Sequence, residues 1–555
     1  MSLRNRLVLP ILLSTIAVLA GCGSSSSSTI VPPPTGGFTN ANLNGTYVFS
    51  VSGTDQAGAP FAMVGTFTAN GMGGNGNGGI TGGTVDINDE DTTIFTTGPI
   101  PNASIGSGSY TVSVDGRGRV SLPTSTPFQT VTLDFVLQDS SHGLITEFDN
   151  DASGSGTFDL QSSGVSPVGT YAFSLSGADY SAANPFVAVG NFTLSGESAA
   201  GLEDFNEGGF SAPDQTLSGT VVLGPSSTPG TTLTTAQNGS LTYDVYAIDA
   251  NHLKFIEMDE FATLSGDAYS QSSTSVPTGT LAFMLEGFFG GLTAPTAAGG
   301  FMVTNGSGGI TTASTEDVNA NLTVSPTLAF SAQYSAAGTG RYTLGNFSGF
   351  YGGTTFVAYP YSVGGSIGLF LLEMDNTPGD IMAGSIYPPQ AAGATFNAGQ
   401  GYGLNLTGDN PLATGTGSVE VDDIAEFSAV ASGAAVTGFD DENFSPGGGP
   451  TYGIPLAGTY VTPDSNGRGS ISATTSNSSG SLSTLNGGFV LTYYTVDGTT
   501  FPFIETDTNS SQVTAGVFVE QNATASASAA AAKPHMFVVP KLVKPHAAVQ
   551  KKSKK

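Results

Sequence analysis

Paired carboxylates recur at four places in the sequence, each time as Glu-x-Asp, in the stretches GLITEFDND, LKFIEMDEF, LFLLEMDNT and FPFIETDTN. The pairs are Glu147 and Asp149, Glu257 and Asp259, Glu373 and Asp375, and Glu505 and Asp507. Residues i and i+2 of a strand point to the same side, so each pair would place two carboxylates about 6 to 7 Å apart. Carboxylates at this spacing could hold a hard cation such as Ca²⁺, or could act as acid and base in glycoside hydrolysis.

Three interpretations of the Glu-x-Asp pairs compete. In a structural role, which we favour, the Glu accepts hydrogen bonds from backbone amides or basic residues and the Asp caps the following turn. A calcium site needs about six to eight oxygens, so each pair would have to join a second repeated motif, Asp-x-Asn. That motif occurs as Asp86 to Asn88, Asp204 to Asn206, Asp317 to Asn319 and Asp441 to Asn443. A hydrolase would need only one such catalytic centre, and the chain repeats the pair four times.

Other catalytic chemistry has few candidate residues. His142 and His252 are expected in hairpin turns without a cysteine or histidine partner, which argues against zinc. Cys22 is the single cysteine. The glycine-rich GMGGNGNGG at Gly71 has no lysine and predicts a hairpin loop more than a phosphate site.

The carboxylate pairs belong to four copies of one unit. The units open with GTYVFSVSG at Gly45, GTYAFSLSG at Gly169, GTLAFMLEG at Gly279 and QGYGLNLTG at Gln400. They close at Gln161, Gln271, Gln390 and Gln521. Apolar residues fill every second position of each opening, which is the period of a half-buried strand. We therefore predict an all-β protein of four tandem antiparallel domains. Up-and-down barrels of about eight strands are favoured and β-sandwiches are the alternative.

The N-terminus has the pattern of a signal peptide, with Arg4 and Arg6 before an apolar run that ends in Leu19-Ala20-Gly21-Cys22. This tetrapeptide resembles the lipobox of bacterial lipoproteins. The resemblance implies cleavage before Cys22 and acylation of that residue, so the chain would attach to the membrane through lipid on Cys22. Gly23 follows where proteobacterial lipoproteins of the inner membrane carry Asp, which implies an outer-membrane location. A second resemblance covers one strand: Gly-Thr-Tyr is similar to the Gly-x-Trp start of lipocalin and avidin barrels. The whole chain also resembles uncharacterised repeat-bearing bacterial envelope lipoproteins.

Charge divides the chain into an acidic body and a basic tail. The sequence has 43 acidic and 14 basic residues, for a net charge of −29. Seven lysines lie in the tail, and the repeats hold only Arg117, Arg119, Lys254, Arg341 and Arg468. Such a body repels nucleic acid, so we expect no nucleic-acid partner. The lysine-rich tail is either a solvated extension or a patch that docks on an anionic envelope polymer.

These patterns predict seven segments. They are a signal peptide 1–21, a Ser/Pro/Gly tether 22–40, repeats 41–163, 164–273, 274–392 and 393–523, and an Ala/Lys-rich tail 524–555. The expected function is that of a lipid-anchored, extracytoplasmic, non-enzymatic binding or surface-structural protein, because repetition multiplies contacts. A carbohydrate-active hydrolase using the paired carboxylates, and a carrier of small apolar ligands inside the barrels, remain alternatives. No cofactor is expected except Ca²⁺ on the eight paired carboxylates.

Overall fold

The computed structural model describes residues 37–524, except 73–76, 91–97, 127–128, 181–183, 225–229, 392, 412–418, 430–433, 476–487 and 509–511. The signal peptide, Cys22, nearly all of the tether and nearly all of the basic tail lie outside these residues. The described chain is almost entirely β-structure, with 33 strands and one short 3-10 turn, η1 (Asn40–Asn42). Among these residues no helix has the length and hydropathy needed to span a bilayer.

The strands fall into four consecutive groups. Barrel 1 contains β1 (Asn44–Asp55), β2 (Pro60–Asn70), β3 (Gly78–Asp89), β4 (Ile100–Ile105), β5 (Gly108–Val112), β6 (Arg117–Pro123), β7 (Thr130–Leu137), β8 (His142–Phe148) and β9 (Ala152–Leu160). Barrel 2 contains β10 (Gly169–Ala178), β11 (Pro185–Ser195), β12 (Ser198–Glu207), β13 (Phe210–Thr220), β14 (Thr231–Thr235), β15 (Gly239–Asp249), β16 (His252–Glu257) and β17 (Ser265–Ser270). Barrel 3 contains β18 (Gly279–Phe289), β19 (Ala294–Thr304), β20 (Gly309–Ala320), β21 (Thr323–Gly338), β22 (Arg341–Ser348), β23 (Phe356–Val363), β24 (Ser366–Glu373) and β25 (Ile381–Pro389). Barrel 4 contains β26 (Gly401–Asn410), β27 (Val419–Ala429), β28 (Ala435–Ser445), β29 (Thr451–Val461), β30 (Arg468–Thr475), β31 (Phe489–Tyr494), β32 (Thr500–Glu505) and β33 (Val513–Glu520).

Each group closes on itself as an antiparallel up-and-down barrel. In barrels 2, 3 and 4 every strand pairs with the next along the chain, and the first pairs with the last. Barrel 1 closes in the same way, with β4 and β5 both paired to β3, so that together they take the place of one strand. The all-β prediction with up-and-down barrels is confirmed, and the sandwich alternative is not found.

Alternation of side chains explains how each barrel fills its interior. In β1, Tyr47, Phe49 and Val51 all point into the core of barrel 1. There the ring of Tyr47 stacks on Phe67 with centroids 5.5 Å apart, and Phe158 meets Tyr47 edge-on at 5.4 Å. The corresponding Tyr171 of barrel 2 and Tyr402 of barrel 4 make the same stack with Phe192 and Phe427. Aromatic side chains therefore occupy the middle of these barrels.

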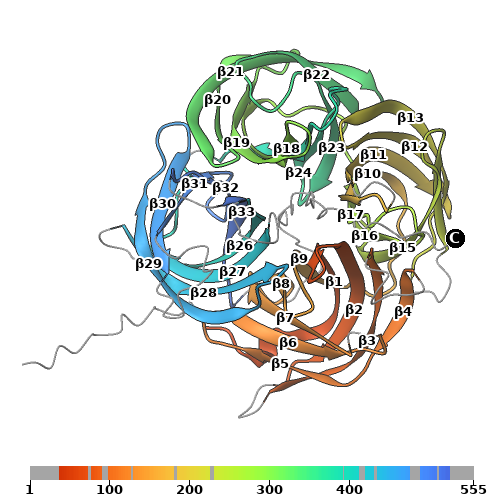
Figure 1. The fold of residues 1–555 in the computed structure, drawn as a ribbon, viewed down its shortest axis with the longest axis vertical. Helices are drawn as coiled ribbons and strands as arrows, with labels where there is room; N and C mark the ends of the chain where they lie inside the picture. Colours follow the sequence, from red (N-terminus) through yellow and green to blue (C-terminus); the bar gives the residue numbers. More distant parts are fainter. Residues whose placement is uncertain are drawn as a thin grey trace, which may run out of the picture.

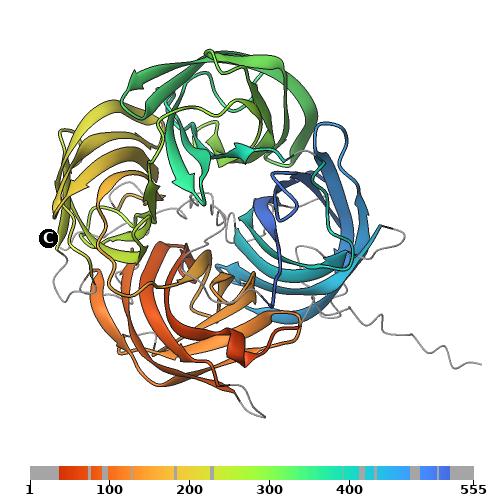
Figure 2. The ribbon, with the colours of Figure 1, turned by 180° about the vertical axis from the view of Figure 1, so that it is seen from behind.

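The four barrels form a closed ring (Figures 1 and 2). Barrel 1 packs β1 and β2 against β15 and β16 of barrel 2, and barrel 2 packs β10, β11 and β17 against β23 and β24 of barrel 3. Barrel 3 packs β18 and β19 against β32 of barrel 4. The ring closes where β26 and β27 of barrel 4 pack on β8 and β9 of barrel 1.

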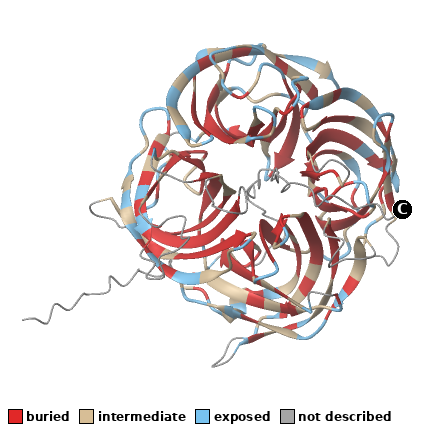
Figure 3. Cartoon of the chain, viewed as in Figure 1, coloured by how far each residue is buried: buried red, intermediate tan, exposed pale blue. Residues whose placement is uncertain are grey.

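Ring closure corrects one expectation from the sequence. Alternation predicted opening strands with one face in solvent, but the second face of these strands packs on a neighbouring barrel. Val48, between Tyr47 and Phe49, is fully buried in an apolar cluster with residues of barrel 2. The remaining members of this cluster are Ala62, Val64, Tyr246, Ile248, Ile256 and Met258. Burial is accordingly concentrated on the strands facing the inside of the ring, and exposed residues lie on the outer strands (Figure 3).

Candidate functional site

The glutamate of each Glu-x-Asp pair lies inside its own barrel. Glu147, Glu257, Glu373 and Glu505 are all buried. Burial raises the pKa of Glu147 well above its ordinary value, with the nearby charge of Asp149 adding to the effect. Burial and then Asp259 raise the pKa of Glu257 to about 11, and burial and then Asp375 raise that of Glu373 to about 9. Burial therefore favours the protonated form of these three glutamates.

The aspartate of each pair holds backbone amides near the end of its strand. Asp149 accepts hydrogen bonds from the amides of Thr132 at 3.2 Å and Asp151 at 2.8 Å. Asp259 accepts from the amides of Thr242 and Phe261 at 2.8 and 3.0 Å. Asp375 and Asp507 likewise accept from the amides of Thr354 and Val490. The bonds from Asp151 and Phe261 lie in the following turn, as the turn-capping interpretation predicts for Asp149 and Asp259. The bonds from Thr354 and Val490 instead join Asp375 and Asp507 to an earlier part of the chain.

The Asp-x-Asn motif meets the Glu-x-Asp motif of the following barrel. Asn88 Nδ2 of barrel 1 donates to the carbonyl oxygens of Glu257 and Ala262 in barrel 2, both at 2.8 Å. The same bridges run from Asn206 to Glu373 and Asp380, from Asn319 to Glu505 and Gln512, and from Asn443 to Glu147 and Ala152. The calcium hypothesis predicted that these two motifs would meet as oxygen ligands. They meet between barrels, and the asparagine amide joins them through main-chain carbonyls, with Asn88 also donating to Glu257 Oε2 at 2.9 Å.

The aspartate of Asp-x-Asn forms an ion pair across three of the four interfaces. Arg341 of barrel 3 binds Asp204 of barrel 2 in bidentate geometry, with N–O distances of 2.7 and 2.6 Å. Arg468 binds Asp317 in the same way, and Arg117 of barrel 1 binds Asp441 of barrel 4. Between barrels 1 and 2 the equivalent position holds Ser240, which like these arginines follows a glycine with positive φ. Here Asp86 accepts from Tyr246 and lies beside Asp244.

The glutamine that ends each unit makes a further bond to the next barrel. Gln161 Nε2 donates to the Ala247 carbonyl at 2.8 Å, and Gln521 donates to the carbonyls of Asp115 and Leu137 at 2.8 and 3.0 Å. Gln271 and Gln390 reach barrels 3 and 4 in the same manner. Because Gln521 and Asn443 both reach barrel 1, one repeated set of side chains joins all four interfaces. Sequence reasoning found these motifs but not their partners, since each partner lies one repeat away.

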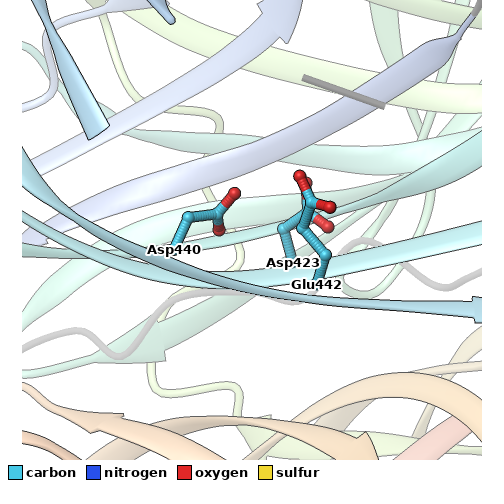
Figure 4. A group of neighbouring side chains, drawn as sticks. All are labelled: Asp423, Asp440 and Glu442. Carbon is cyan, nitrogen blue, oxygen red and sulfur yellow. The ribbon is translucent and has the colours of Figure 1, made fainter. Parts of the chain in front are cut away.

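Among the residues that the structure describes, barrel 4 alone brings three acidic side chains together in its interior. Asp423 on β27 and Asp440 and Glu442 on β28 point into this barrel, with ligand oxygens within 4.8 Å of one another (Figure 4). All three are buried, and both oxygens of Asp423 and of Asp440 have no hydrogen-bond partner among the described residues. The other barrels place apolar residues where Asp423 and Glu442 lie. These residues are Met63 and Ile87 in barrel 1, Ala188 and Phe205 in barrel 2, and Ala298 and Val318 in barrel 3.

This acidic group could hold a divalent cation. Burial, and then the charges of neighbouring carboxylates, raise the pKa values of Asp423 and Asp440 well above the ordinary range. A hard cation would compensate this repulsion and would bind the ionised carboxylates. Of the eight carboxylates predicted as calcium ligands, Glu505 is the one whose charge acts on Asp423. A sequence signal for this group exists, because Val-Asp-Asp-Ile and Phe-Asp-Asp-Glu-Asn interrupt an apolar alternation.

The two histidines of the body line one cavity of about 310 Å³ where barrels 1, 2 and 3 meet. His142 Nδ1 lies 2.8 Å from Asp159, and His252 Nε2 lies 2.6 Å from Asp267. Between them Lys254, with 1% of its side chain exposed, lies 3.0 Å from Asp267 and 3.8 Å from Asp159. Each histidine is the first residue of its strand, after the turn in which the sequence places it. Their shared cavity was not predicted.

Comparisons with known proteins do not identify a family for this chain. No protein-family model and no curated protein matches the sequence. Similar solved structures include transferrin binding protein B of serogroup B Neisseria meningitidis, at 12% identity over 69% of this chain and 84% of that chain, with a TM-score of 0.19. A mutant of transferrin binding protein B from Haemophilus parasuis Hp5 is similar at 10% identity over 69% and 84%, with a TM-score of 0.20. Likeness at these scores carries no argument about fold or function.

Proposed function

We propose that the chain is a lipid-anchored, extracytoplasmic envelope protein whose four-barrel ring is a rigid, non-enzymatic scaffold for binding at the cell surface. The observation that carries the proposal is the use of the repeated polar motifs in joining the barrels. Asn88, Asn206, Asn319 and Asn443 each bind the next barrel, so repetition of the motifs serves assembly of the ring. The repetition of the motifs therefore does not require four independent catalytic centres.

The hydrolase alternative is less well supported by the same geometry. An acid and base need access to a substrate, and Glu147 is 2% exposed while Asp149 already binds two backbone amides. The apolar-carrier alternative is opposed by the aromatic side chains that occupy the barrel interiors. In barrel 4, for example, the ring centroids of Phe396 and Phe501 are 4.6 Å apart. Both alternatives are tested by incubating the full chain with chromogenic glycosides and by extracting copurified lipid or pigment.

The anchoring part of the proposal rests on Leu19-Ala20-Gly21-Cys22. Cells expressing the full chain should incorporate labelled palmitate into it, and Cys22→Ser should remove the label and release the chain from the membrane fraction. Sucrose-gradient separation of the two membranes then tests the outer-membrane prediction from Gly23. Unchanged labelling in Cys22→Ser would overturn the anchor.

A further inference from the structure

A second, larger cavity of about 620 Å³ is lined by residues of β21 and β22 in barrel 3, two strands on the outer side of the ring (Figure 1). Its lining includes Asn305, Gln333, Tyr334, Thr343, Asn346 and Thr355, together with serine and glycine residues. None of its described lining residues is charged, although the chain carries 43 acidic residues. This cavity is distinct from the barrel joints and from the histidine cavity.

Local irregularity of the sheet opens the cavity. β22 pairs with β23 over only three residues, Tyr342 to Leu344, and separates from it beyond that point. Against β21 the register shifts between Ser331 and Gln333, which marks a bulge in β22. Asn346 lies in this bulge with a φ of 53°, a conformation that is uncommon for residues other than glycine. Bulges of this kind redirect side chains, and here both Asn346 and its partner Gln333 are exposed.

The side chains that face the cavity present neutral hydrogen-bonding groups. Asn346 Nδ2 donates to Gln333 Oε1 at 3.1 Å. This bond leaves the amide N–H groups of Gln333 as donors and the side-chain carbonyl of Asn346 as an acceptor. Tyr334, the next residue of β21, packs instead against the core of barrel 3, so it adds no aromatic surface beside Gln333 and Asn346. An adjacent donor and acceptor suit a ligand with vicinal hydroxyl groups.

We infer that this cavity binds a neutral carbohydrate chain. Sugar hydroxyls both donate and accept, so one hydroxyl can accept from Gln333 while a neighbouring hydroxyl donates to Asn346. Absence of charge removes the desolvation cost that a carboxylate would add. An anionic polysaccharide would also be repelled by the acidic body. The inference deepens the proposed binding role and rests on it.

Isothermal titration calorimetry tests the site on the full chain, purified in a detergent without a sugar headgroup. The probes are maltohexaose, cellohexaose and the hexamer of N-acetylglucosamine, with oligogalacturonate as the charged comparison. We expect one neutral oligosaccharide to bind. Gln333→Ala combined with Asn346→Gly should weaken it about tenfold, the loss of two hydrogen bonds. Glycine suits the positive φ of position 346, so the bulge is retained. Gln215→Ala on β13, the corresponding strand of barrel 2, is the matched control.

The outcomes separate this site from the proposed function. Failure of all three neutral oligosaccharides to bind, or equal binding by the double variant, would overturn the carbohydrate site. Equal binding of oligogalacturonate would overturn its preference for neutral chains. None of these results changes palmitate labelling at Cys22 or the thermal stability of the ring, which test the anchor and the scaffold on their own.

Discussion

Asn443 and Glu147 are 296 residues apart in sequence, yet the side-chain amide of Asn443 donates to the backbone carbonyl of Glu147 at 2.8 Å. A second bond of 2.8 Å joins Asn443 to the carbonyl of Ala152. The other three motif asparagines bind the barrel that follows them in the chain, whereas Asn443 binds the first barrel. It therefore closes the ring, and its bonds must be made without a short covalent connection to bring the partners together.

Asn443→Ala should destabilise the junction between barrels 4 and 1. It leaves two buried carbonyls without their donor, and each such loss costs about 1 to 3 kcal/mol. We expect a lower melting temperature by scanning calorimetry, with earlier proteolytic cleavage of barrel 4 or barrel 1. Asn251→Ala, in an exposed turn of barrel 2, is the control. A melting temperature for Asn443→Ala equal to that of the control would show that the ring does not depend on this bridge.

Lys254 should be more important to the junction of barrels 1 and 2 than any exposed charge. It is buried and donates to Ser50 and Thr157 of barrel 1 and to Asp267 of its own barrel. Its charge and a hydrogen bond from His252 hold the pKa of Asp267 below the ordinary value, against the opposing effect of burial. Lys254→Met removes the cation beside this carboxylate and leaves His252 as its partner. We expect a loss of up to about 3 to 5 kcal/mol, the cost typical of a broken buried pair.

A double-mutant cycle measures the Lys254 contribution. Lys254→Met with Asp267→Asn removes both charges and should recover part of the lost free energy of unfolding in urea titrations. Additive losses in the double variant would contradict a direct ion pair. Arg119→Met supplies a comparison, because that ion pair with Asp134 lies within barrel 1 and its arginine is 40% exposed.

Local pattern was sufficient to predict the barrels. Tyr47, Phe49 and Val51 alternate with small residues in a period that only a strand can have, and the turn signals between strands are short. The ring could not be predicted, because Ser50 and Val48 look like ordinary outward positions until a neighbouring barrel covers them. Likewise Asn88 and Glu257 carry no sequence signal of their contact, which depends on how two separately folded units dock.

The candidate site, like the fold, could be predicted from the sequence only in part. The sequence located Glu147 and Asp149 and favoured a capping role for the aspartate, which its contacts match. It did not identify Asp440 and Asp423 as a group, because they are on different strands and become neighbours only through the register of β27 with β28. Register is fixed by packing inside the barrel, so it is available only from the three-dimensional structure.

Stability should decrease as pH rises through neutrality, with a contribution from Asp244. Burial and then the charge of Asp86 raise the pKa of Asp244 to about 7, and burial also raises that of Asp86. An unfolded aspartate has a pKa of about 3.9, so folding favours the protonated form. The stabilisation is complete below about pH 4 and is lost as pH rises through about 7. Burial raises the pKa of Glu203 and Glu316 to about 8, which acts in the same direction.

Melting temperatures measured from pH 4 to pH 9 test this dependence. Asp244→Asn should reduce the decrease between pH 5 and pH 8, since the amide has no proton to lose. Glu197→Gln, in an exposed turn of barrel 2, should leave the profile unchanged. A wild-type profile that rises over this range, or an Asp244→Asn profile identical to the wild type, would contradict the assignment.

Calcium should stabilise the ring through barrel 4. Ca²⁺ bound to Asp423, Asp440 and Glu442 would compensate three buried carboxylates, and at 100 times its Kd a ligand that binds only the folded state adds about 2.7 kcal/mol. Millimolar Ca²⁺ should therefore raise the melting temperature of the full chain, and EDTA should reverse the increase. Asp440→Asn should abolish the response, whereas Glu203→Gln, at the equivalent position of barrel 2, should retain it.

A response abolished by Asp149→Asn but retained in Asp440→Asn would indicate that Ca²⁺ binds at the repeated Glu-x-Asp pairs and not in the interior of barrel 4. Unchanged melting in Ca²⁺ would leave both sets of carboxylates with structural roles alone.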